Sequence, residues 1–342
     1  MAEITVVITA HNLEQYLENC LKDLEFQTFR DFEILVVNDC STDGTADIIS
    51  RYAEQHPDRV RWFSTPANLR YVGLVRNAAL DSGLISGKYV IFLDGDDRMN
   101  PRFLEKLYRA AEEQNADIAL CAYERVVQTT GHILSREMTN FPPLVFPRLD
   151  SAMLPFMNGS VWNKLIRFER IGSSRFPEIK VGEDVIFSLR LYSCCEKIVI
   201  LDEILFSYYV RGNSLIGNAQ ESDAYRLAEQ FSALEAMRPL PEFTEALKLA
   251  AFIHVGISMP MRIYENDRTH IVRLLTWIDR WFSKQYGWFQ NAKYFKTSFL
   301  LRHKIQGLGI AMAKSCYRLH CFRLFLQVYH LFVSTLNLDI KF

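Results

Sequence analysis

The sequence lacks three features that would place it in familiar classes of protein. It contains no run of about 18 or more apolar residues, so we expect no membrane-spanning helix. Its start has neither the basic residues nor the long apolar stretch of a signal peptide, so we expect a cytoplasmic protein. The seven cysteines form an odd number without a C-x-x-C pair, which favours reduced thiols over disulfides or a zinc site.

A glycine-rich phosphate loop is also missing. The first expected strand runs into Thr9, Ala10, His11 and Asn12, without the G-x-G-x-x-G that brings a backbone close to a pyrophosphate. If the protein binds a diphosphate, another group must neutralise its charge.

Acidic residues are absent between Arg280 and Leu338, where nine lysines and arginines stand. Aromatic residues alternate with these cations at Trp281, Phe282, Tyr286, Trp288, Phe289, Tyr294, Phe295 and Phe299. Such a segment is typical of a helix lying on an anionic lipid surface, and we expect membrane contact through residues 280–338. The alternatives are a helical cap whose aromatic side chains pack on the remainder of the protein and a dimer interface. The rest of the chain carries a net negative charge and contains no recognisable nucleic-acid-binding module, which argues against nucleic-acid binding.

The order of patterns along the chain indicates an α/β fold. Across the first 125 residues, short β-branched runs alternate with amphipathic helical stretches, which predicts a mainly parallel sheet flanked by helices. We expect strands at 4–9, 32–38, 60–64, 89–93 and 118–123, and helices at 15–27, 45–55, 69–82 and 101–115. Ligands of such sheets bind beyond the carboxyl ends of the strands. From about residue 224 the pattern is helical, which predicts one part over 1–220 and a helical extension over 221–342.

An acidic run follows the apolar strand at 89–93. Asp94, Asp96 and Asp97 place three carboxylates within four residues, where they repel one another unless a cation is present. Mg²⁺ and Mn²⁺ suit such oxygen ligands and share their remaining coordination with water and phosphates. The alternative is a solvated acidic turn before the helix near Pro101. The strand-end position favours the metal.

Two further sites carry acidic residues at ends of predicted elements. Asp39 follows the strand at 32–38, where an acid is well placed to bond a ribose or a base edge. Glu183 and Asp184 precede an apolar helical stretch, and a helix dipole stabilises carboxylates at that position.

These blocks, in this order, resemble the bacterial family 2 glycosyltransferases, which have the nucleotide-sugar-binding GT-A fold. The resemblance covers roughly residues 3–215 and is carried by 6–12, 38–45, 93–97, 162–165, 183–184 and 208–214. It implies an inverting enzyme that moves a sugar from a nucleotide-diphosphate donor, with UDP favoured, to a glycan or glycolipid acceptor. Such an enzyme would serve bacterial surface polysaccharide or lipopolysaccharide synthesis at the inner face of the cytoplasmic membrane. The donor-binding half would be 1–125 and the acceptor half 126–220.

Carried over residue by residue, the resemblance implies how the donor is bound. Thr9 and Asp39 would bind the base with Arg76 nearby, Asp94 would contact the ribose, and Asp96 would ligate the metal at the diphosphate. Two departures affect the base site: His11 stands where a tyrosine is usual, and Asn38-Asp39-Cys40 replaces the usual Asp-Asp-Gly. Asp97 would support the metal site or face the acceptor.

The resemblance also assigns the proton transfer. Asp184 would be the general base that takes the proton of the attacking acceptor hydroxyl, with Glu183 in support. Stabilisation of the helix N-terminus is the alternative role for this pair.

Other blocks suggest contacts with the acceptor and the leaving group. Trp162, Asn163 and Lys164 are expected to line the acceptor pocket, because an aromatic face suits a sugar ring, with a core tryptophan as the alternative. Arg211 would reach the diphosphate, or be a surface arginine at a strand end.

Two other functions compete with glycosyl transfer. A non-catalytic nucleotide-sugar-binding scaffold would tolerate the loss of Asp184. A D-x-D phosphatase would use Asp94 as its nucleophile, but that class has its acidic motif near the start of the fold.

Overall fold

The computed structural model describes residues 2–139, 145–147, 151–210, 219–237, 240–266, 268–289 and 292–336. The chain divides into two compact units. The first, here the α/β unit, comprises Met1–Arg148, Asn158–Glu178 and Glu183–Arg211. The second, the helical unit, comprises Leu149–Met157, Ile179–Gly182 and Gly212–Phe342. Two short segments from the expected first part therefore belong to the helical unit.

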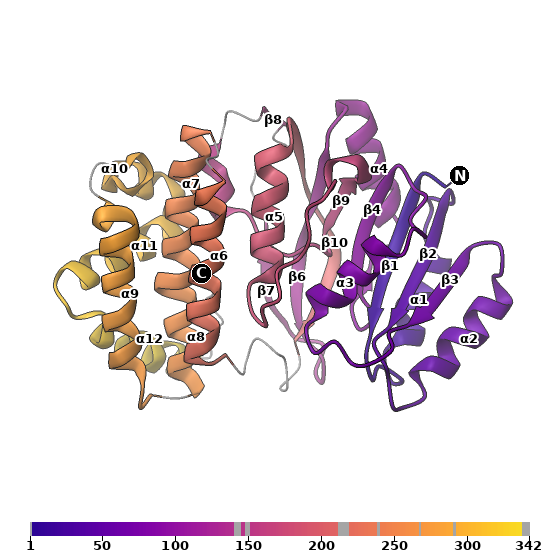
Figure 1. Cartoon of the computed structure of the whole chain (residues 1–342), viewed down its shortest axis with the longest axis horizontal. Helices are drawn as coiled ribbons and strands as arrows, with labels where there is room; N and C mark the ends of the chain where they lie inside the picture. The colour runs from indigo at the N-terminus through magenta and orange to yellow at the C-terminus, as the bar shows by residue number, and fades with distance from the viewer. Residues whose placement is uncertain are drawn as a thin grey trace. The chain divides into compact units, whose positions relative to one another are not determined.

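The α/β unit is built on one sheet with the strand order β3-β2-β1-β4-β9-β6-β10-β5. The strands are β1 (Ile4–Ala10), β2 (Phe32–Asn38), β3 (Val60–Ser64), β4 (Tyr89–Asp94), β5 (Arg98–Met99), β6 (Ile118–Val127), β7 (Ile133–Glu137), β8 (Val145–Pro147), β9 (Lys164–Arg167) and β10 (Lys197–Val210). Figure 1 shows β3, β2, β1 and β4 side by side, and these four strands run parallel. The predicted α/β class is confirmed.

Beyond β4 the sheet becomes mixed. β9 is antiparallel to both β4 and β6, whereas β6 and β10 run parallel to each other. The short strands β5, β7 and β8 add further antiparallel pairs. The sequence pattern did not indicate these strands, because two to five residues are too few for a recognisable period.

Burial explains why the central strands are almost continuously apolar. All seven residues of β1 are buried, as are the first five of β4, because the helices of an α/β fold cover both faces of its sheet. The helices of this unit are α1 (Leu17–Glu25), α2 (Thr45–Gln55), α3 (Val72–Asp81), α4 (Phe103–Gln114) and α5 (Glu183–Cys194). The carboxyl ends of β1, β2 and β4 lie together at one edge of the sheet.

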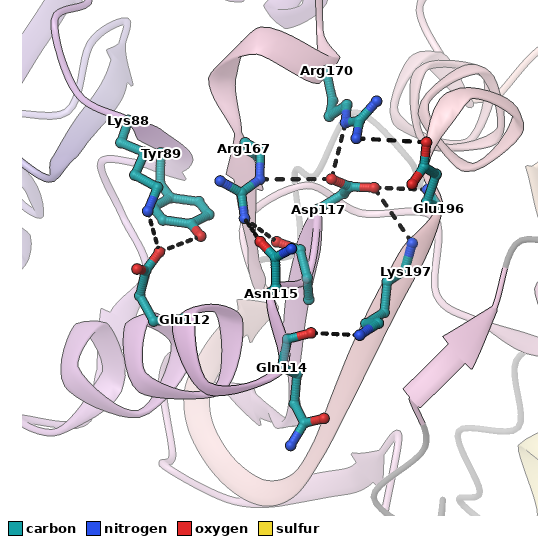
Figure 2. Close-up of polar contacts among 11 residues, drawn as sticks. Lys88, Tyr89, Glu112, Gln114, Asn115, Asp117, Arg167, Arg170, Glu196 and Lys197 are labelled. Atoms are coloured by element: carbon teal, nitrogen blue, oxygen red, sulfur yellow. Dashed lines mark hydrogen bonds and ion pairs between the residues drawn. The ribbon is translucent and has the colours of Figure 1, made fainter.

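A charged network joins strand ends at the opposite edge (Figure 2). Asp117, just before β6, is 3% exposed and accepts hydrogen bonds from the backbone N–H of Glu196 at 2.7 Å and of Lys197 at 3.4 Å. Its other oxygen accepts from Arg170 Nε at 2.9 Å, and Arg167 Nε lies 3.6 Å away. A buried carboxylate needs such partners, and here they fix the starts of β6 and β10 to the end of β9.

The helical unit has an aromatic core. Its elements are η1 (Ser151–Phe156), α6 (Glu221–Ala236), α7 (Pro241–Ala251), η4 (Phe252–Ser258), α8 (Met259–Asn266), α9 (Ile271–Tyr286), η5 (Gly287–Phe289), η6 (Lys293–Phe295), α10 (Thr297–Leu300), η7 (Leu301–His303), α11 (Lys304–Arg318) and α12 (Phe322–Leu336). Phe252 is fully buried, and its ring lies 5.3 to 5.8 Å from those of Phe282, Phe289, Phe295 and Tyr317. Five of the eight aromatic residues expected to face lipid are at most 8% exposed: Phe282, Tyr286, Phe289, Tyr294 and Phe295. These five side chains pack inside the helical unit and do not face outward as the lipid-surface expectation requires.

One helical stretch among the described residues is long and apolar enough to cross a membrane. It is the 25-residue stretch Pro241–Glu265, whose most apolar window of 18 residues has a mean hydropathy of 1.3. Within its most apolar window, 83% of the stretch is buried inside the protein, so we assign it to the core of the helical unit.

Candidate active site

The predicted base-binding residues lie where β1, β2 and β4 end. Thr9 pairs with Asp94 in the sheet register, and its hydroxyl donates a hydrogen bond to Asp94 Oδ1 at 3.2 Å. Asp39 is 5% exposed and is fixed through Oδ1, which accepts from Thr65 Oγ1 at 2.8 Å and from the backbone N–H of Leu69 at 2.9 Å. The side chains of Thr9, Asp39 and Asp94 therefore lie along the same edge of the sheet.

His11, Asn38 and Cys40, the three residues that depart from the family pattern, lie beside Asp39. His11 is exposed, with Nδ1 at 2.7 Å from the Asp39 carbonyl oxygen, and Asn68 Nδ2 lies 3.1 Å from its ring nitrogens. Cys40 has a φ of 50°, in the left-handed region that favours glycine. The resembled pattern has glycine at this position, so the turn is kept although its usual residue is not.

Arg76 joins the end of β4 to the start of α5. Its side chain is 1% exposed, and it donates hydrogen bonds to Asp94 Oδ1 at 2.7 Å through Nη2 and to Asp184 Oδ1 at 2.5 Å through Nη1. Nη1 also lies 3.8 Å from Glu183 Oε1. The prediction placed Arg76 near the base, whereas its guanidinium lies between the predicted ribose contact and the predicted general base.

Burial raises the pKa of both carboxyls at the start of α5. Desolvation, then the charge of Asp184, raises the pKa of Glu183 to about 8. Desolvation also raises the pKa of Asp184, although Arg76 opposes the change. The two side chains are 12% and 16% exposed, so both still reach the surface of the site. A raised pKa makes a carboxylate a stronger proton acceptor near neutral pH.

Both residues also lie in the first turn of α5. A helix N-terminus favours negative charge, so the position suits the alternative role of stabilising the helix as well. The contact with Arg76 distinguishes Asp184 from an ordinary first-turn carboxylate, because a purely stabilising residue would need no buried cation.

Asp97 is turned into the protein. It is 1% exposed, and Oδ1 accepts a hydrogen bond from the backbone N–H of Tyr209 at 3.0 Å. Its Oδ2 is buried without a partner among the described residues. Burial, with the charge of Asp94, raises the pKa of Asp97 well above its usual range. Its expected roles were to support the metal site or to face the acceptor; the structure shows a buried side chain that anchors the acidic turn to β10.

The acidic run can offer a metal ion only a few protein ligands. No cluster of three or more His, Cys, Asp or Glu side chains suited to a metal occurs within the described part of the chain. Asp94 contacts Arg76 and Thr9, and Asp97 is buried, while Asp96 lies partly exposed between them. Mg²⁺ is commonly held by one or two carboxylates, with waters and substrate phosphates as its other ligands. The carboxylates present therefore fit a divalent cation that takes its remaining ligands from a diphosphate.

Trp162 and Asn163 lie in the interior. Trp162 is 5% exposed and packs against the rings of Tyr123, Phe206 and Tyr208 at centroid distances of 4.6, 4.7 and 5.5 Å. Asn163 is fully buried and donates to the Cys121 carbonyl oxygen at 2.7 Å. The expectation that these side chains line the acceptor pocket does not match their burial, whereas the alternative of core residues does.

Lys164 is fully buried as well, and a loop folds around it. Its ammonium donates to the Asn158 carbonyl at 2.9 Å, to Asn158 Oδ1 at 2.7 Å and to the Ser160 carbonyl. Burial lowers the pKa of Lys164 to about 7, although the negative charge of Asp184 opposes the change. The same loop carries Val161, whose backbone N–H donates a hydrogen bond to Asp184. Lys164 therefore supports the loop beside Asp184 rather than facing an acceptor.

Sequence reasoning missed Gly73, on α3. A Cβ at this position would stand 2.9 Å from Phe176 Cβ and 3.2 Å from Glu183 Cγ. Only glycine lets α3 approach α5 this closely, which in turn lets Arg76 reach Asp184. The lone glycine within the predicted helix at 69–82 was the available signal. Arg211, also part of the predicted site, lies outside the described residues.

Comparisons with known proteins agree on one family. The sequence profile named Glycosyl transferase family 2 matches residues 5–174. The Glycosyltransferase GlyA of Streptococcus pneumoniae is 32% identical over 62% of this chain and 31% of GlyA. Poly(ribitol-phosphate) beta-N-acetylglucosaminyltransferase TarS of Staphylococcus aureus is 27% identical over 70% of this chain and 40% of TarS. The matched region thus spans less than half of either relative.

Solved structures show the same fold. S. aureus TarS 1–349 in complex with UDP has a TM-score of 0.69 at 23% identity, covering 94% of this chain and 92% of that chain. Mannosyltransferase PcManGT from Pyrobaculum calidifontis, in complex with GDP-Man and Mn²⁺, has a TM-score of 0.56 at 17% identity, covering 96% and 86%. These likenesses confirm the predicted fold.

Proposed function

The chain belongs to glycosyltransferase family 2, and from this premise we propose that it transfers a sugar from a UDP-sugar to a glycan or glycolipid acceptor with inversion at the anomeric carbon. The observation that carries the proposal is the contact of Arg76 with both Asp94 and Asp184. It places a carboxylate of raised pKa next to the strand end at which the donor is expected to bind.

The donor site would extend along the ends of β1, β2 and β4. Asp39 and Thr9 would bind the base, His11 would border it from the exposed side, and Asp94 would contact the ribose. UDP is supported by the structural neighbour TarS, which has been solved with UDP and with UDP-GlcNAc. The protein's own side chains give no preference between bases.

A divalent cation, Mg²⁺ or Mn²⁺, would be held by Asp96 together with the donor's phosphates. When bound, such an ion neutralises charge on the departing diphosphate. The Mn²⁺ complex of the neighbour PcManGT supports this assignment. Arg211 stays proposed as a further positive group at the diphosphate.

Asp184 would act as the general base of a single displacement. The acceptor hydroxyl oxygen forms a bond to the anomeric carbon while the bond from that carbon to the phosphate oxygen breaks. The hydroxyl proton moves to Asp184, and the nucleoside diphosphate leaves with the bonding electrons. Arg76 stays protonated because the adjacent carboxylates raise its pKa further, so it cannot compete for that proton.

The acceptor would be a cell-surface polymer or its lipid-linked precursor. TarS is named for poly(ribitol-phosphate), which supports an acceptor of this broad class without defining it. We place the α/β unit as the catalytic part and the reaction at the cytoplasmic face of the membrane.

The test measures turnover of a panel of nucleotide sugars. Release of the nucleotide is recorded for each sugar, with and without EDTA. We expect metal-dependent release that falls about 100-fold or more in Asp184→Asn and in Asp96→Ala, with the exposed Glu113→Gln on α4 as control. Release that ignores EDTA and both substitutions would contradict the mechanism. Phosphate found covalently on Asp94 would instead identify a phosphatase, and tight donor binding without any turnover would identify a scaffold.

A further inference from the structure

Exposed apolar side chains gather at the C-terminal end of the helical unit. Of the twelve large apolar side chains exposed among the described residues, seven lie between Leu301 and Leu331. Isolated exposed apolar residues are normal in proteins, but a concentration of them marks a surface that contacts something else.

These residues follow the period of the helices that carry them. On α11 and just after its end, Leu308, Met312 and Leu319 recur at intervals of four and seven and are 49%, 50% and 74% exposed. On α12, Leu324 and Val328 stand four apart and are 58% and 59% exposed. Each helix thus carries an apolar stripe on its outer side in addition to the one buried in the unit.

Positive charge borders both stripes. Arg302, Arg318 and Arg323 are exposed, and none of the three forms an ion pair with a described residue. Lys314 is different, because its ammonium donates to the Phe295 carbonyl at 2.6 Å and so belongs to the packing of the unit. The sequence from 280 to 338 contains no acidic residue, so the helices that carry these arginines bring no negative side chain of their own.

We propose that the outer face formed by Leu308, Met312, Leu319, Leu324 and Val328, here the α11–α12 face, binds the surface of an anionic lipid bilayer. Aliphatic side chains would enter the boundary between headgroups and acyl chains, while the arginines contact lipid phosphates. Two 15-residue helices cannot span a bilayer, so they lie on it.

The unbalanced charge selects this occupant over a second copy of the chain. In a symmetric dimer, the same face meets itself, so the arginines of one copy would approach those of the other and repel them. A bilayer containing anionic lipid supplies the opposite charge instead.

The inference differs from the expectation drawn from the aromatic residues. Five of those eight side chains belong to the core of the unit, whereas the exposed large apolar residues from 301 to 331 are aliphatic and lie further along the chain. The membrane inference rests on the proposed function in one respect: the purpose of membrane binding would be to hold the enzyme near a lipid-linked acceptor.

The test is co-sedimentation of the full chain with phosphatidylcholine vesicles, with or without phosphatidylglycerol. We expect binding only when phosphatidylglycerol is present, weakened by salt. The double substitution Leu324→Gln with Val328→Gln should reduce affinity at least about tenfold. Arg318→Gln and Arg323→Gln should each reduce it about fivefold. Met237→Gln with Leu240→Gln is the matched control, since both residues are exposed apolar side chains of the same unit outside this face.

Two results would overturn the proposal. One is absence of binding to anionic vesicles, or binding that Leu324→Gln with Val328→Gln leaves unchanged. The other is a dimer in solution that the same substitutions dissociate, which would assign the face to a second copy. Nucleotide release from a free UDP-sugar is measured in parallel. It should be unchanged in all of these variants, so failure of the membrane inference stays separate from failure of the enzymatic one.

Discussion

Arg76 shows what a sequence can and cannot reveal at the scale of single residues. The resemblance identified Arg76, Asp94 and Asp184 as members of a site, and the structure brings all three together. The resemblance could not identify which pairs are in contact, because the three residues come from three elements and stand up to 108 positions apart in the sequence. Motif spacing carries no information on contacts of that kind.

The pH dependence of the reaction follows from the same contact. Asp184 must be deprotonated to accept a proton, so activity rises as the pH passes through its pKa, which burial raises above that of an ordinary aspartate. Lysine lacks the planar fork through which the two terminal nitrogens of Arg76 separately reach Asp94 and Asp184, so its contact with Asp184 should be weaker. We therefore expect Arg76→Lys to raise the pKa of Asp184 further and to move the acid limb of kcat/KM to higher pH. Profiles of both proteins, with Arg61→Lys as control, test this, and an unmoved limb would count against the assignment.

Burial is the second limit on prediction from single residues. Trp162, Asn163 and Lys164 were expected at an acceptor pocket because aromatic and polar side chains suit sugars. The same residue types also build cores, and at 5%, 0% and 0% exposure these three do so. Nothing local in the sequence separates the two outcomes.

At the scale of elements, long periodic segments were predictable and short ones were not. The expected helix at 45–55 and the strands at 32–38 and 60–64 coincide with α2, β2 and β3. The strand β9 was missed although it joins the two halves of the sheet, because it has only four residues and the first two lie in the motif 162–165, which was interpreted as an acceptor site.

Gly73 gives a test of how closely two elements must approach. Alanine there would press against Phe176 and Glu183, so α3 or α5 must shift. Since a displacement of about 1 Å can cost a reaction 100-fold, we expect Gly73→Ala to lower kcat by about ten- to 100-fold. Steady-state kinetics with a UDP-sugar measure this, and full activity would show that the spacing of the helices does not matter.

The Asp117 network predicts a loss of stability without a loss of chemistry. Asp117→Ala removes the buried carboxylate partner of Arg167 and Arg170, which are 12% and 33% exposed, and of the backbone N–H of Glu196, which should destabilise the fold by about 1–3 kcal/mol. Glu196→Gln is the control, because its ion pair at 3.9 Å is 71% exposed on the glutamate side and contributes at most about 1 kcal/mol. Thermal unfolding measures both changes. Since the network lies at the sheet edge opposite the site, kcat per folded molecule should stay the same in each variant.

At the scale of the whole molecule, the C-terminal region is a structural part of the protein. Phe252 lies outside residues 280–338, yet four of the aromatic rings that pack around it belong to that segment. Composition indicated the unusual character of residues 280–338 but not which side chains face outward, since aromatic and aliphatic residues are both apolar. Only the packing separates a buried aromatic core from an exposed aliphatic face.

Deletion of residues 280–342 should therefore unfold the helical unit. It would expose Phe252 and the buried stretch Pro241–Glu265, so we expect aggregation and loss of the cooperative thermal transition of this unit. Met312→Gln with Leu324→Gln should instead unfold like the wild type, because both side chains are at least half exposed. Soluble yield and calorimetry compare the three proteins, and a stable, soluble truncation would contradict the described core.

The most direct test of the enzyme assignment separates donor binding from sugar transfer in Asp184→Asn. Calorimetric titration with UDP and transfer from the UDP-sugar identified in the panel would be measured on the same preparation. The account predicts UDP affinity close to that of the wild type with transfer reduced at least about 100-fold, because the substitution removes the proton acceptor and leaves Asp39, Thr9 and Asp96 in place. Transfer at the wild-type rate by Asp184→Asn would contradict it.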